Sequence, residues 1–216
     1  MLLPDQRNEV VQACRQLLAT GLVRGTSGNV SLRQAESGSI AITPTGVGYP
    51  DMQAEQVAVL DTAGRQLDGA LRPTSELALH LGIYRQRPDV HAVVHTHSMY
   101  ATTFAVLGEP LPAVHYLIAR AGGRVPLAPY ARYGTLELAQ ACVRTLEDGL
   151  AVLLANHGVV AVGPDLAAAM AVAEAVEFVA ELAWRARLAG TPNLLTEAQL
   201  AEAAEALADY GSQPSE

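Results

Sequence analysis

The chain has 216 residues, half of them hydrophobic, and a formal net charge of -8 at pH 7. This length and composition predict one domain over residues 1–216 with a sizeable core, because no linker-like stretch divides the sequence. The acidic charge and the lack of a basic stripe exclude a typical nucleic-acid partner and an anionic membrane surface. All 14 basic residues are arginine, which excludes mechanisms that need a lysine Schiff base or a P-loop lysine.

The sequence also indicates a cytoplasmic protein. Its first residues contain no long apolar core, so we expect no signal peptide, and no run of about 18 apolar residues predicts a membrane span. The two cysteines, Cys14 and Cys142, lie far apart in the sequence and form neither a disulfide framework nor a CxxC pair.

The first seventy residues predict a helix followed by short strands. An amphipathic helix is expected from about Asp5 to Thr20. The glycines and hydroxyl residues of the following stretch, RGTSGN, can form an anion cradle or a plain turn. Strand signals then follow at residues 30–32, 39–43, 57–61 and 65–67. Because short turns join them, they predict a largely antiparallel sheet and not a Rossmann domain.

Two histidines stand at the end of the next predicted strand. A helix over Ser75–Arg87, with Thr74 and Ser75 as capping hydroxyl residues and a phosphate-binding N-terminus, leads into the apolar run VHAVV. His95 and His97 follow it. Side chains at positions i and i+2 of a strand point to the same face, so both imidazoles can bind one ion.

A third histidine follows another apolar strand. His157 lies in the stretch LLANHG, and Glu76 can add a carboxylate from the start of the helix. A catalytic zinc site needs three or four such ligands. A single histidine on an apolar strand is more often a hydrogen-bonded core residue, and we expect that role for His80 and His91. The paired spacing with a third histidine predicts a metal site.

The second half of the chain alternates helices with apolar segments. Short and medium helices are expected over residues 98–104 and 135–148, with an apolar segment at 113–118 that carries His115 and Tyr116 side by side. Asp165 caps a long alanine-rich helix that ends at Gly190, and Thr196 caps a last helix that ends near Tyr210.

Six motifs, in this order and spacing, resemble the class II aldolase family over about residues 5 to 185: GTSGNVSLR, ITPTGVGY, RPTSELALHLGIYRQRPDVHAVVHTHS, HYLIARAGG, APYARYGT and LLANHGVV. The resemblance implies a three-layer α/β/α fold with a central, mostly antiparallel sheet. It implies aldol cleavage of a ketose 1-phosphate, of the L-fuculose 1-phosphate type, to dihydroxyacetone phosphate and an aldehyde such as L-lactaldehyde.

The resemblance also implies roles for individual residues. One zinc ion per subunit would be held by His95, His97 and His157, with Glu76 as the fourth ligand at rest. Glu76 would then leave the metal and act as the general base at C3, for which its pKa should lie nearer neutrality than that of a free carboxyl. The substrate phosphate would be held by Gly28, Asn29, Thr45, Gly46, Thr74 and Ser75.

A homotetramer is implied as well, with the site between neighbouring subunits. Tyr116 matches a pocket tyrosine of the fuculose-phosphate enzymes, and Tyr210 would reach a neighbouring subunit from the C-terminal segment that begins near residue 196. Either tyrosine would protonate or orient the aldehyde oxygen, and zinc would stabilise the carbanion as a Lewis acid.

Three alternatives share the fold. L-Ribulose-5-phosphate 4-epimerases use the same metal site but tend to place an aspartate where Glu76 stands. Sugar-phosphate dehydratases and decarboxylases share the histidines. The adducin head domain is a non-catalytic interaction module that loses the metal ligands, whereas this chain keeps all four.

Overall fold

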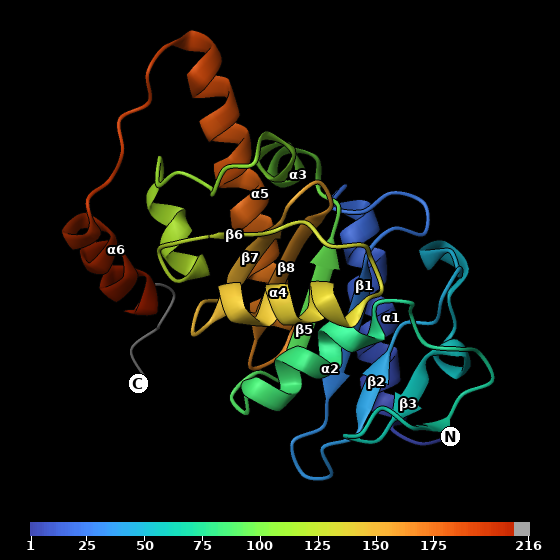
Figure 1. The fold of residues 1–216 in the computed structure, drawn as a ribbon. Coiled ribbons are helices and arrows are strands. Elements are labelled where there is room, and N and C mark those ends of the chain that lie inside the picture. Colours follow the sequence, from blue (N-terminus) through green and yellow to red (C-terminus); the bar gives the residue numbers. More distant parts are fainter. Residues whose placement is uncertain (210–216) are drawn as a thin grey trace.

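The fold is a single twisted sheet covered by helices on both faces. In the computed structural model, which describes residues 1–209, eight strands form one sheet in the order β4-β3-β2-β1-β5-β8-β7-β6 (Figure 1). Neighbouring strands are antiparallel except for the pair β6 and β7. The strands are β1 (Asn29–Arg33), β2 (Ile40–Ile42), β3 (Ala58–Leu60), β4 (Gln66–Asp68), β5 (Ala92–Thr96), β6 (Leu127–Ala128), β7 (Ala151–Leu154) and β8 (Gly158–Gly163).

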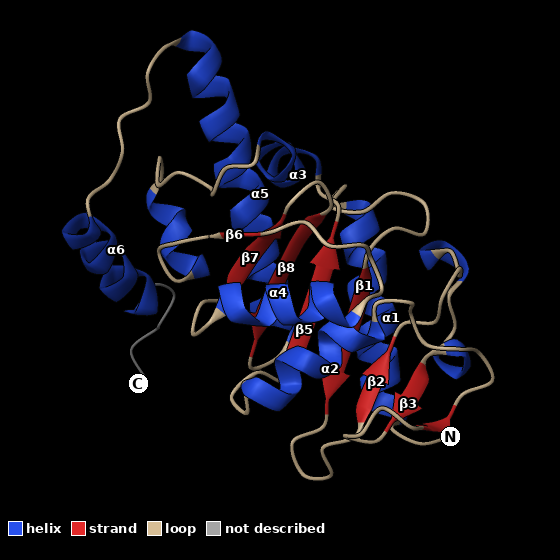
Figure 2. Cartoon of the chain, in the orientation of Figure 1, coloured by secondary structure: helices blue, strands red, loops and turns tan. Residues whose placement is uncertain are grey.

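Helices form the outer two layers, as Figure 2 shows. One face packs against α1 (Pro4–Ala19), α3 (Met99–Leu107) and α5 (Leu166–Ala189), and the other against α2 (Leu77–Gln86) and α4 (Leu136–Leu146). The last helix, α6 (Glu197–Asp209), contacts the 3-10 helix η3 (Tyr116–Ala121), which itself packs on α5. Two shorter 3-10 helices are η1 (Tyr49–Asp51) and η2 (Ala54–Gln56). The three-layer α/β/α architecture is therefore confirmed.

The central strand β5 determines which layer the histidines face. All of its residues are buried, and Val93 belongs to the hydrophobic cluster under α2 and α4, whereas Val94 belongs to the cluster under α1, α3 and α5. Because side chains alternate along a strand, His95 lies on the same face as Val93. The sequence pattern thus directs the histidine pair toward the N-terminus of α2.

The predicted start of the second helix is wrong by two residues. Helix α2 begins at Leu77 with Glu76 as its N-cap residue, and no side chain caps it. The reason is that Thr74 is held in an extended connection, since its N–H donates to Thr43 O (2.9 Å) and its hydroxyl accepts from Glu76 N (3.3 Å). The hydroxyl residues at this point consequently line a cavity and do not cap the helix.

Other predicted helix starts are confirmed. Thr135, Asp165 and Thr196 each accept a hydrogen bond from a backbone N–H in the first turn of α4, α5 and α6. The two-residue strand β6 was not predicted, because its pairing with β7 is non-local. Within residues 1–209, no helix combines the length and the apolar character needed to cross a bilayer. Tyr210 lies outside the described residues.

Candidate metal centre and active site

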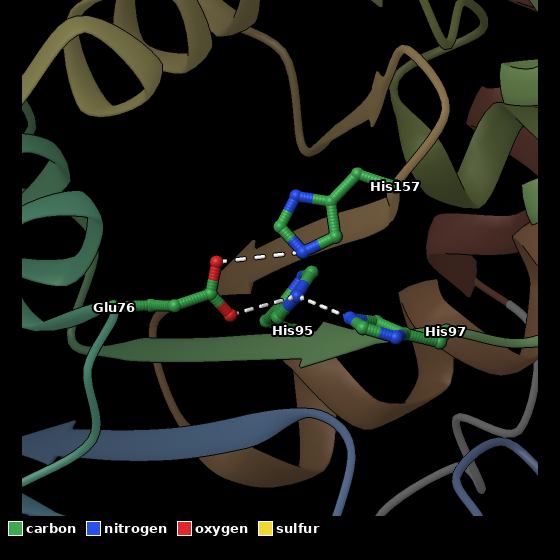
Figure 3. Close-up of side chains that lie close together, drawn as sticks. All are labelled: Glu76, His95, His97 and His157. Carbon is green, nitrogen blue, oxygen red and sulfur yellow. Dashed lines mark hydrogen bonds and ion pairs between the residues drawn. The ribbon is translucent and has the colours of Figure 1, made fainter. Parts of the chain in front are cut away.

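Four predicted ligands converge at one end of the sheet. His95 is in β5, His97 follows that strand, His157 lies in the turn between β7 and β8, and Glu76 precedes α2 (Figure 3). One potential ligand atom from each of the four lies within 4.8 Å of the others. His95 Nε2 is 3.0 Å from His97 Nε2 and 3.1 Å from Glu76 Oε2, and His157 Nε2 is 3.4 Å from Glu76 Oε1.

The three imidazole rings are arranged around a common point. Each pair of ring centroids is 4.9 Å apart, with interplanar angles between 70° and 79°. Nitrogen atoms about 3 Å apart, as found for His95 and His97, match the separation of neighbouring ligands on an ion with bonds of about 2.0–2.1 Å. The histidine cluster therefore has the spacing of a metal site.

Two glycines allow the histidine segments to approach one another this closely. A Cβ atom at Gly158 would lie 2.4 Å from Thr96 O and 3.0 Å from the His97 ring. At Gly28, where φ is +83°, a Cβ would lie 2.6 Å from His95 O. Only glycine fits at these positions, so the turns before and beside the histidines are part of the site's construction.

The donor set fits a cation. His95 Nδ1 donates to Val159 O at 2.9 Å, because a carbonyl can only accept, so Nε2 is the ring nitrogen that points into the cluster. There it faces the carboxylate oxygen Oε2 of Glu76 and the ring of His97. Glu76 Oε1 is buried without a hydrogen-bond partner. Converging acceptors of this kind are stabilised by a proton or by a metal ion placed among them.

The protonation states suit metal binding. Burial and the charge of neighbouring His95 lower the pKa of His97 and that of His157 to about 4, so both rings are neutral ligands near pH 7. Burial by itself raises the pKa of the Glu76 carboxyl, but the charge of His95 and hydrogen bonds from His95 and Asn29 outweigh it and hold that pKa well below its usual range. Glu76 is thus a carboxylate in this contact.

A cavity of about 380 Å³ opens beside the cluster. All six residues that were predicted to hold a phosphate line it, namely Gly28, Asn29, Thr45, Gly46, Thr74 and Ser75. Apart from histidines, no basic side chain is among the described residues that line the cavity. A phosphate there would be held by neutral N–H and O–H donors next to the N-terminus of α2.

The Asn29 side chain has a contact that the sequence did not reveal. Its Nδ2 donates to Glu76 Oε2 at 2.9 Å, and its Oδ1 lies 2.6 Å from His80 Nε2. His80, predicted to be structural, is fully buried and lies directly behind the site. Both contacts join residues some fifty positions apart, and only the paired strands and α2 bring them together.

Three cavity residues were missed by sequence reasoning. Tyr130 and Tyr133 line the cavity from the loop before α4, and Asn156 lines it from the turn that carries His157. The signal was present in APYARYGT, where two tyrosines flank an arginine in a loop that ends in a helix-capping threonine. Large exposed aromatic side chains in such a loop, here 65% and 61% exposed, are candidates for ligand contact.

One predicted catalytic tyrosine, Tyr116, is not in this cavity within one chain. Tyr116 begins η3, is exposed, and stacks on His115 with ring centroids 4.5 Å apart. It is not among the residues that line the cavity. Tyr210 lies outside the described residues. A role for Tyr116 or Tyr210 in catalysis thus stays a prediction that involves a neighbouring subunit.

Residues 8–184 match the family model described as the class II aldolase and adducin N-terminal domain. The chain belongs to this family. It is 43% identical, over 99% of its length and 100% of the relative's, to a 5-deoxy-D-ribulose 1-phosphate aldolase of Bacillus thuringiensis serovar kurstaki. It is 36% identical to an L-fuculose phosphate aldolase of Escherichia coli strain K12, over 94% of each chain.

Solved structures agree with this family assignment. The fold superimposes on an L-fuculose 1-phosphate aldolase with a TM-score of 0.92, at 39% identity and covering 94% of this chain and 96% of the other. The protein is an enzyme of the class II aldolase group, a carbon-carbon lyase.

Proposed function

We propose that this class II aldolase cleaves a ketose 1-phosphate between C3 and C4, giving dihydroxyacetone phosphate and a short aldehyde, with one zinc ion per subunit. The observation that supports this most directly is the position of the four-ligand cluster. It lies at the wall of a cavity whose other described lining residues carry no charged side chain and offer neutral N–H and O–H donors. A reacting carbonyl and a phosphate can therefore be bound side by side.

Zinc would be held by His95, His97 and His157, with Glu76 beside it at rest. Bound there, the ion would supply Lewis-acid stabilisation of the carbanion that forms on C3. Neutral imidazoles preserve the charge of the ion, which favours that stabilisation. Since the sequence contains no lysine, an iminium route through a side-chain amine is closed.

Glu76 would move the proton at C3. In cleavage the C4 hydroxyl gives its proton to the Glu76 carboxylate, the C3–C4 bond breaks, C4 becomes the aldehyde carbon, and the electron pair stays on C3. The protonated Glu76 carboxyl then gives that proton to C3. In the synthetic direction the carboxylate removes the same proton. Its pKa is held low while it contacts His95, so separation from the cluster is what would make the carboxylate basic.

The phosphate would be bound by the loops on the far side of the cavity. Thr45 and Gly46 come from one loop and Thr74 and Ser75 from the connection to α2, and Gly28 lines the same cavity. Gly46 has a φ of +72° and Gly28 one of +83°, so their N–H groups can turn toward an anion. Held in this way, C1 would place C2 and C3 next to the cluster.

The comparisons suggest two candidate substrates. Both contain the dihydroxyacetone phosphate half that this cavity would bind. L-Fuculose 1-phosphate gives lactaldehyde, and 5-deoxyribulose 1-phosphate gives acetaldehyde, each with dihydroxyacetone phosphate. The first is the substrate suggested by Tyr116 and by the relative from Escherichia coli. The second is favoured by the 43% identity to the Bacillus thuringiensis relative along the whole of both chains.

We further propose a homotetramer in which Tyr116 and the C-terminal segment complete a neighbour's site at the aldehyde end. The exposure of the Tyr116 side chain supports this, because a pocket residue donated to another subunit must lie at the surface of its own. Tyr116 or Tyr210 would then orient or protonate the aldehyde oxygen. Small charged substrates and soluble aldehydes fit a cytoplasmic location.

The test is release of dihydroxyacetone phosphate from each ketose 1-phosphate, before chelation, after chelation, and after zinc is returned. Zinc content per chain is measured in the same samples. Activity that disappears with the chelator and returns with zinc would support the proposal, and the ratio of kcat/KM for the two substrates would assign the aldehyde end. A protein with stoichiometric zinc that cleaves neither substrate would overturn the ketose 1-phosphate assignment.

Two other outcomes separate the alternatives. Conversion of L-ribulose 5-phosphate to its C4 epimer would indicate an epimerase of the same fold, although a glutamate stands at position 76. Neither zinc binding nor turnover of any sugar phosphate would favour a non-catalytic module of the adducin type.

A further inference from the structure

A buried chain of hydrogen bonds runs from Glu76 into the interior. Asn29 is 4% exposed and His80 is fully buried. The Asn29 amide donates from Nδ2 to Glu76 Oε2 at 2.9 Å, and its Oδ1 lies 2.6 Å from His80 Nε2. The side chain that touches the carboxylate is therefore itself held from behind.

The series of hydrogen bonds continues through two more residues, Ser31 and Tyr84. Ser31 Oγ lies 2.6 Å from His80 Nδ1 and 2.7 Å from the Tyr84 hydroxyl, and Tyr84 also lies 3.2 Å from His91 O. Ser31 is fully buried and Tyr84 nearly so. Each side-chain N and O atom of the four residues Asn29, His80, Ser31 and Tyr84 has a hydrogen-bond partner, as the free-energy cost of burying polar groups requires.

The direction of these hydrogen bonds follows from the Glu76 carboxylate. A carboxylate can only accept, so Asn29 must present its NH2 group to Glu76 and its oxygen to His80. His80 then donates from Nε2. A neutral ring has one N–H, so Nδ1 accepts from the Ser31 hydroxyl. The opposite arrangement would turn the Asn29 oxygen toward the carboxylate, and two acceptors would face each other.

We propose that His80 is a positioning residue for the active site: by fixing the orientation of the Asn29 amide, it keeps Glu76 beside the metal ligands. The inference rests on the proposed function, because it assumes that Glu76 approaches a metal. His80 touches neither substrate nor ion. It acts through Asn29, and Ser31 acts through His80 by setting its tautomer.

The proposal differs from a packing role in its consequence for metal binding. Without the His80 donor, Asn29 Oδ1 is a buried acceptor with no partner, and the amide gains by rotating away from Glu76. The carboxylate then loses its only hydrogen bond from a neutral side chain and is held less firmly beside the cluster. Changes to residues that orient metal ligands weaken metal affinity by about 10–100-fold.

The experiment is a double-mutant cycle on zinc affinity. Zinc affinity of the full chain is measured by competition with a chromophoric chelator for four proteins: wild type, His80→Leu, Glu76→Gln, and His80→Leu/Glu76→Gln. We expect His80→Leu to weaken zinc binding at least tenfold in the wild-type background. In the Glu76→Gln background the same change should alter it less than threefold, because a glutamine amide accepts either orientation of Asn29.

Three further variants test the route. His80→Gln keeps an N–H donor near the position of Nε2 and should restore most of the zinc affinity. Leu79→Ala removes a buried side chain next to His80 on α2 and should lower Tm while leaving zinc affinity unchanged. If His80→Leu does not fold, Ser31→Ala replaces it in the cycle, since that change removes the hydroxyl that fixes the His80 tautomer without adding bulk.

The outcomes distinguish this inference from the proposed function. A wild-type chain that binds no zinc and cleaves no sugar phosphate would remove the basis of both. If the wild-type chain binds zinc and is active, two results would overturn the positioning role alone. One is an equal loss of zinc affinity on His80→Leu in the wild-type and Glu76→Gln backgrounds. The other is a loss of zinc affinity in Leu79→Ala as large as that in His80→Leu.

Discussion

Glu76 has two carboxylate oxygens in different surroundings. Oε2 accepts from Asn29 and faces His95, while Oε1 lies 3.4 Å from His157 Nε2 and has no hydrogen bond. One oxygen is thus anchored by Asn29, and the other is buried without a hydrogen-bond partner. A residue with this placement can hold a resting metal site together and still transfer a proton after small movements.

Replacing Glu76 tests that second role. Glu76→Gln keeps the shape of the side chain but removes the base, so we expect kcat to fall by about 10²–10⁴-fold. Zinc should still bind through the three histidines. The measurement is exchange of the C3 proton of dihydroxyacetone phosphate with deuterated water, alongside zinc content. Exchange at the wild-type rate in zinc-loaded Glu76→Gln would assign the base to another residue.

Gly158 tests how tightly the histidines are packed. A methyl group at this position would lie 2.4 Å from Thr96 O and 3.0 Å from the His97 ring, so Gly158→Ala must push the β8 turn away from β5. We expect stability to fall by about 1–3 kcal/mol and zinc affinity to fall about tenfold or more.

Gly48→Ala is the matched control for that substitution. Its Cβ would meet only Pro50 at 3.9 Å, and its φ of -69° suits any residue. Stability and zinc affinity should both remain close to wild type, within about 0.5 kcal/mol for stability. Equal effects of the two substitutions, measured by urea unfolding and chelator competition, would contradict the close-packing argument.

At the scale of elements, two connections are joined along the part of the cavity where we propose that the phosphate binds. Thr45 N–H donates to Arg72 O at 3.0 Å, Thr74 N–H donates to Thr43 O at 2.9 Å, and Pro44 and Pro73 form an antiparallel bridge. The loop after β2 and the segment before α2 therefore act as one unit. Their hydroxyl groups are held in place by backbone hydrogen bonds that side-chain substitutions leave intact.

Because the backbone of these two connections is held in place, a hydroxyl group can be removed there without disturbing the metal site. We expect Ser75→Ala to raise KM for the ketose 1-phosphate about tenfold or more, as loss of a hydrogen bond to a charged group implies, with zinc content unchanged. Thr103→Ala, which removes a hydroxyl bonded to its own helix on α3, is the control and should leave KM unaltered. If Ser75→Ala leaves KM unchanged, then the phosphate lies elsewhere.

Sequence patterns predicted the elements better than their connections. The period-two pattern of β5 and the i, i+2 spacing of His95 and His97 followed directly from local geometry, and so did the start of α4 and the caps of α5 and α6. The start of α2 did not, because the hydrogen bonds that hold Thr74 extended come from a loop thirty residues earlier. The contact between Asn29 and Glu76 was likewise invisible, since it depends on strand pairing.

At the scale of the whole molecule, the core lies in two hydrophobic clusters, one on each face of the sheet. The buried polar chain around His80 lies on the side of α2. Burial and the charge of His95 lower the pKa of His80 from 6.5 to about 3. Between these pH values the unfolded chain binds more protons at His80 than the folded chain does. The contribution of neutral His80 to the free energy of unfolding is therefore fully present above pH 6.5 and decreases as the pH falls below it.

The metal-free protein should therefore be sensitive to acid. We expect its free energy of unfolding to decrease by about 2 kcal/mol between pH 7 and pH 5 from His80 alone. Urea unfolding at several pH values measures the slope. His80→Gln has no titrating ring at this position and should show a shallower slope, whereas identical slopes for the two proteins would show that His80 stays uncharged in both states or titrates alike in both.

At the scale of the assembly, the oligomeric state could be predicted from the sequence only through the family resemblance. Hydrophobic periodicity describes what is buried within a chain, and the exposed tyrosine of η3 is indistinguishable from an ordinary surface residue by that measure. The roles that we propose for Tyr116 and Tyr210 at the aldehyde end therefore rest on the family resemblance.

The ligands come from positions 76, 95, 97 and 157, so an ion bound to all four would act as a cross-link between the start of α2, the central strand and the β7–β8 turn. Such a link closes long loops through a single atom, and it stabilises the folded chain because the unfolded chain has no preformed site. Amide hydrogen exchange should consequently slow on zinc loading at these three separated segments together, while α6, which packs on η3, should exchange at the same rate with and without the ion.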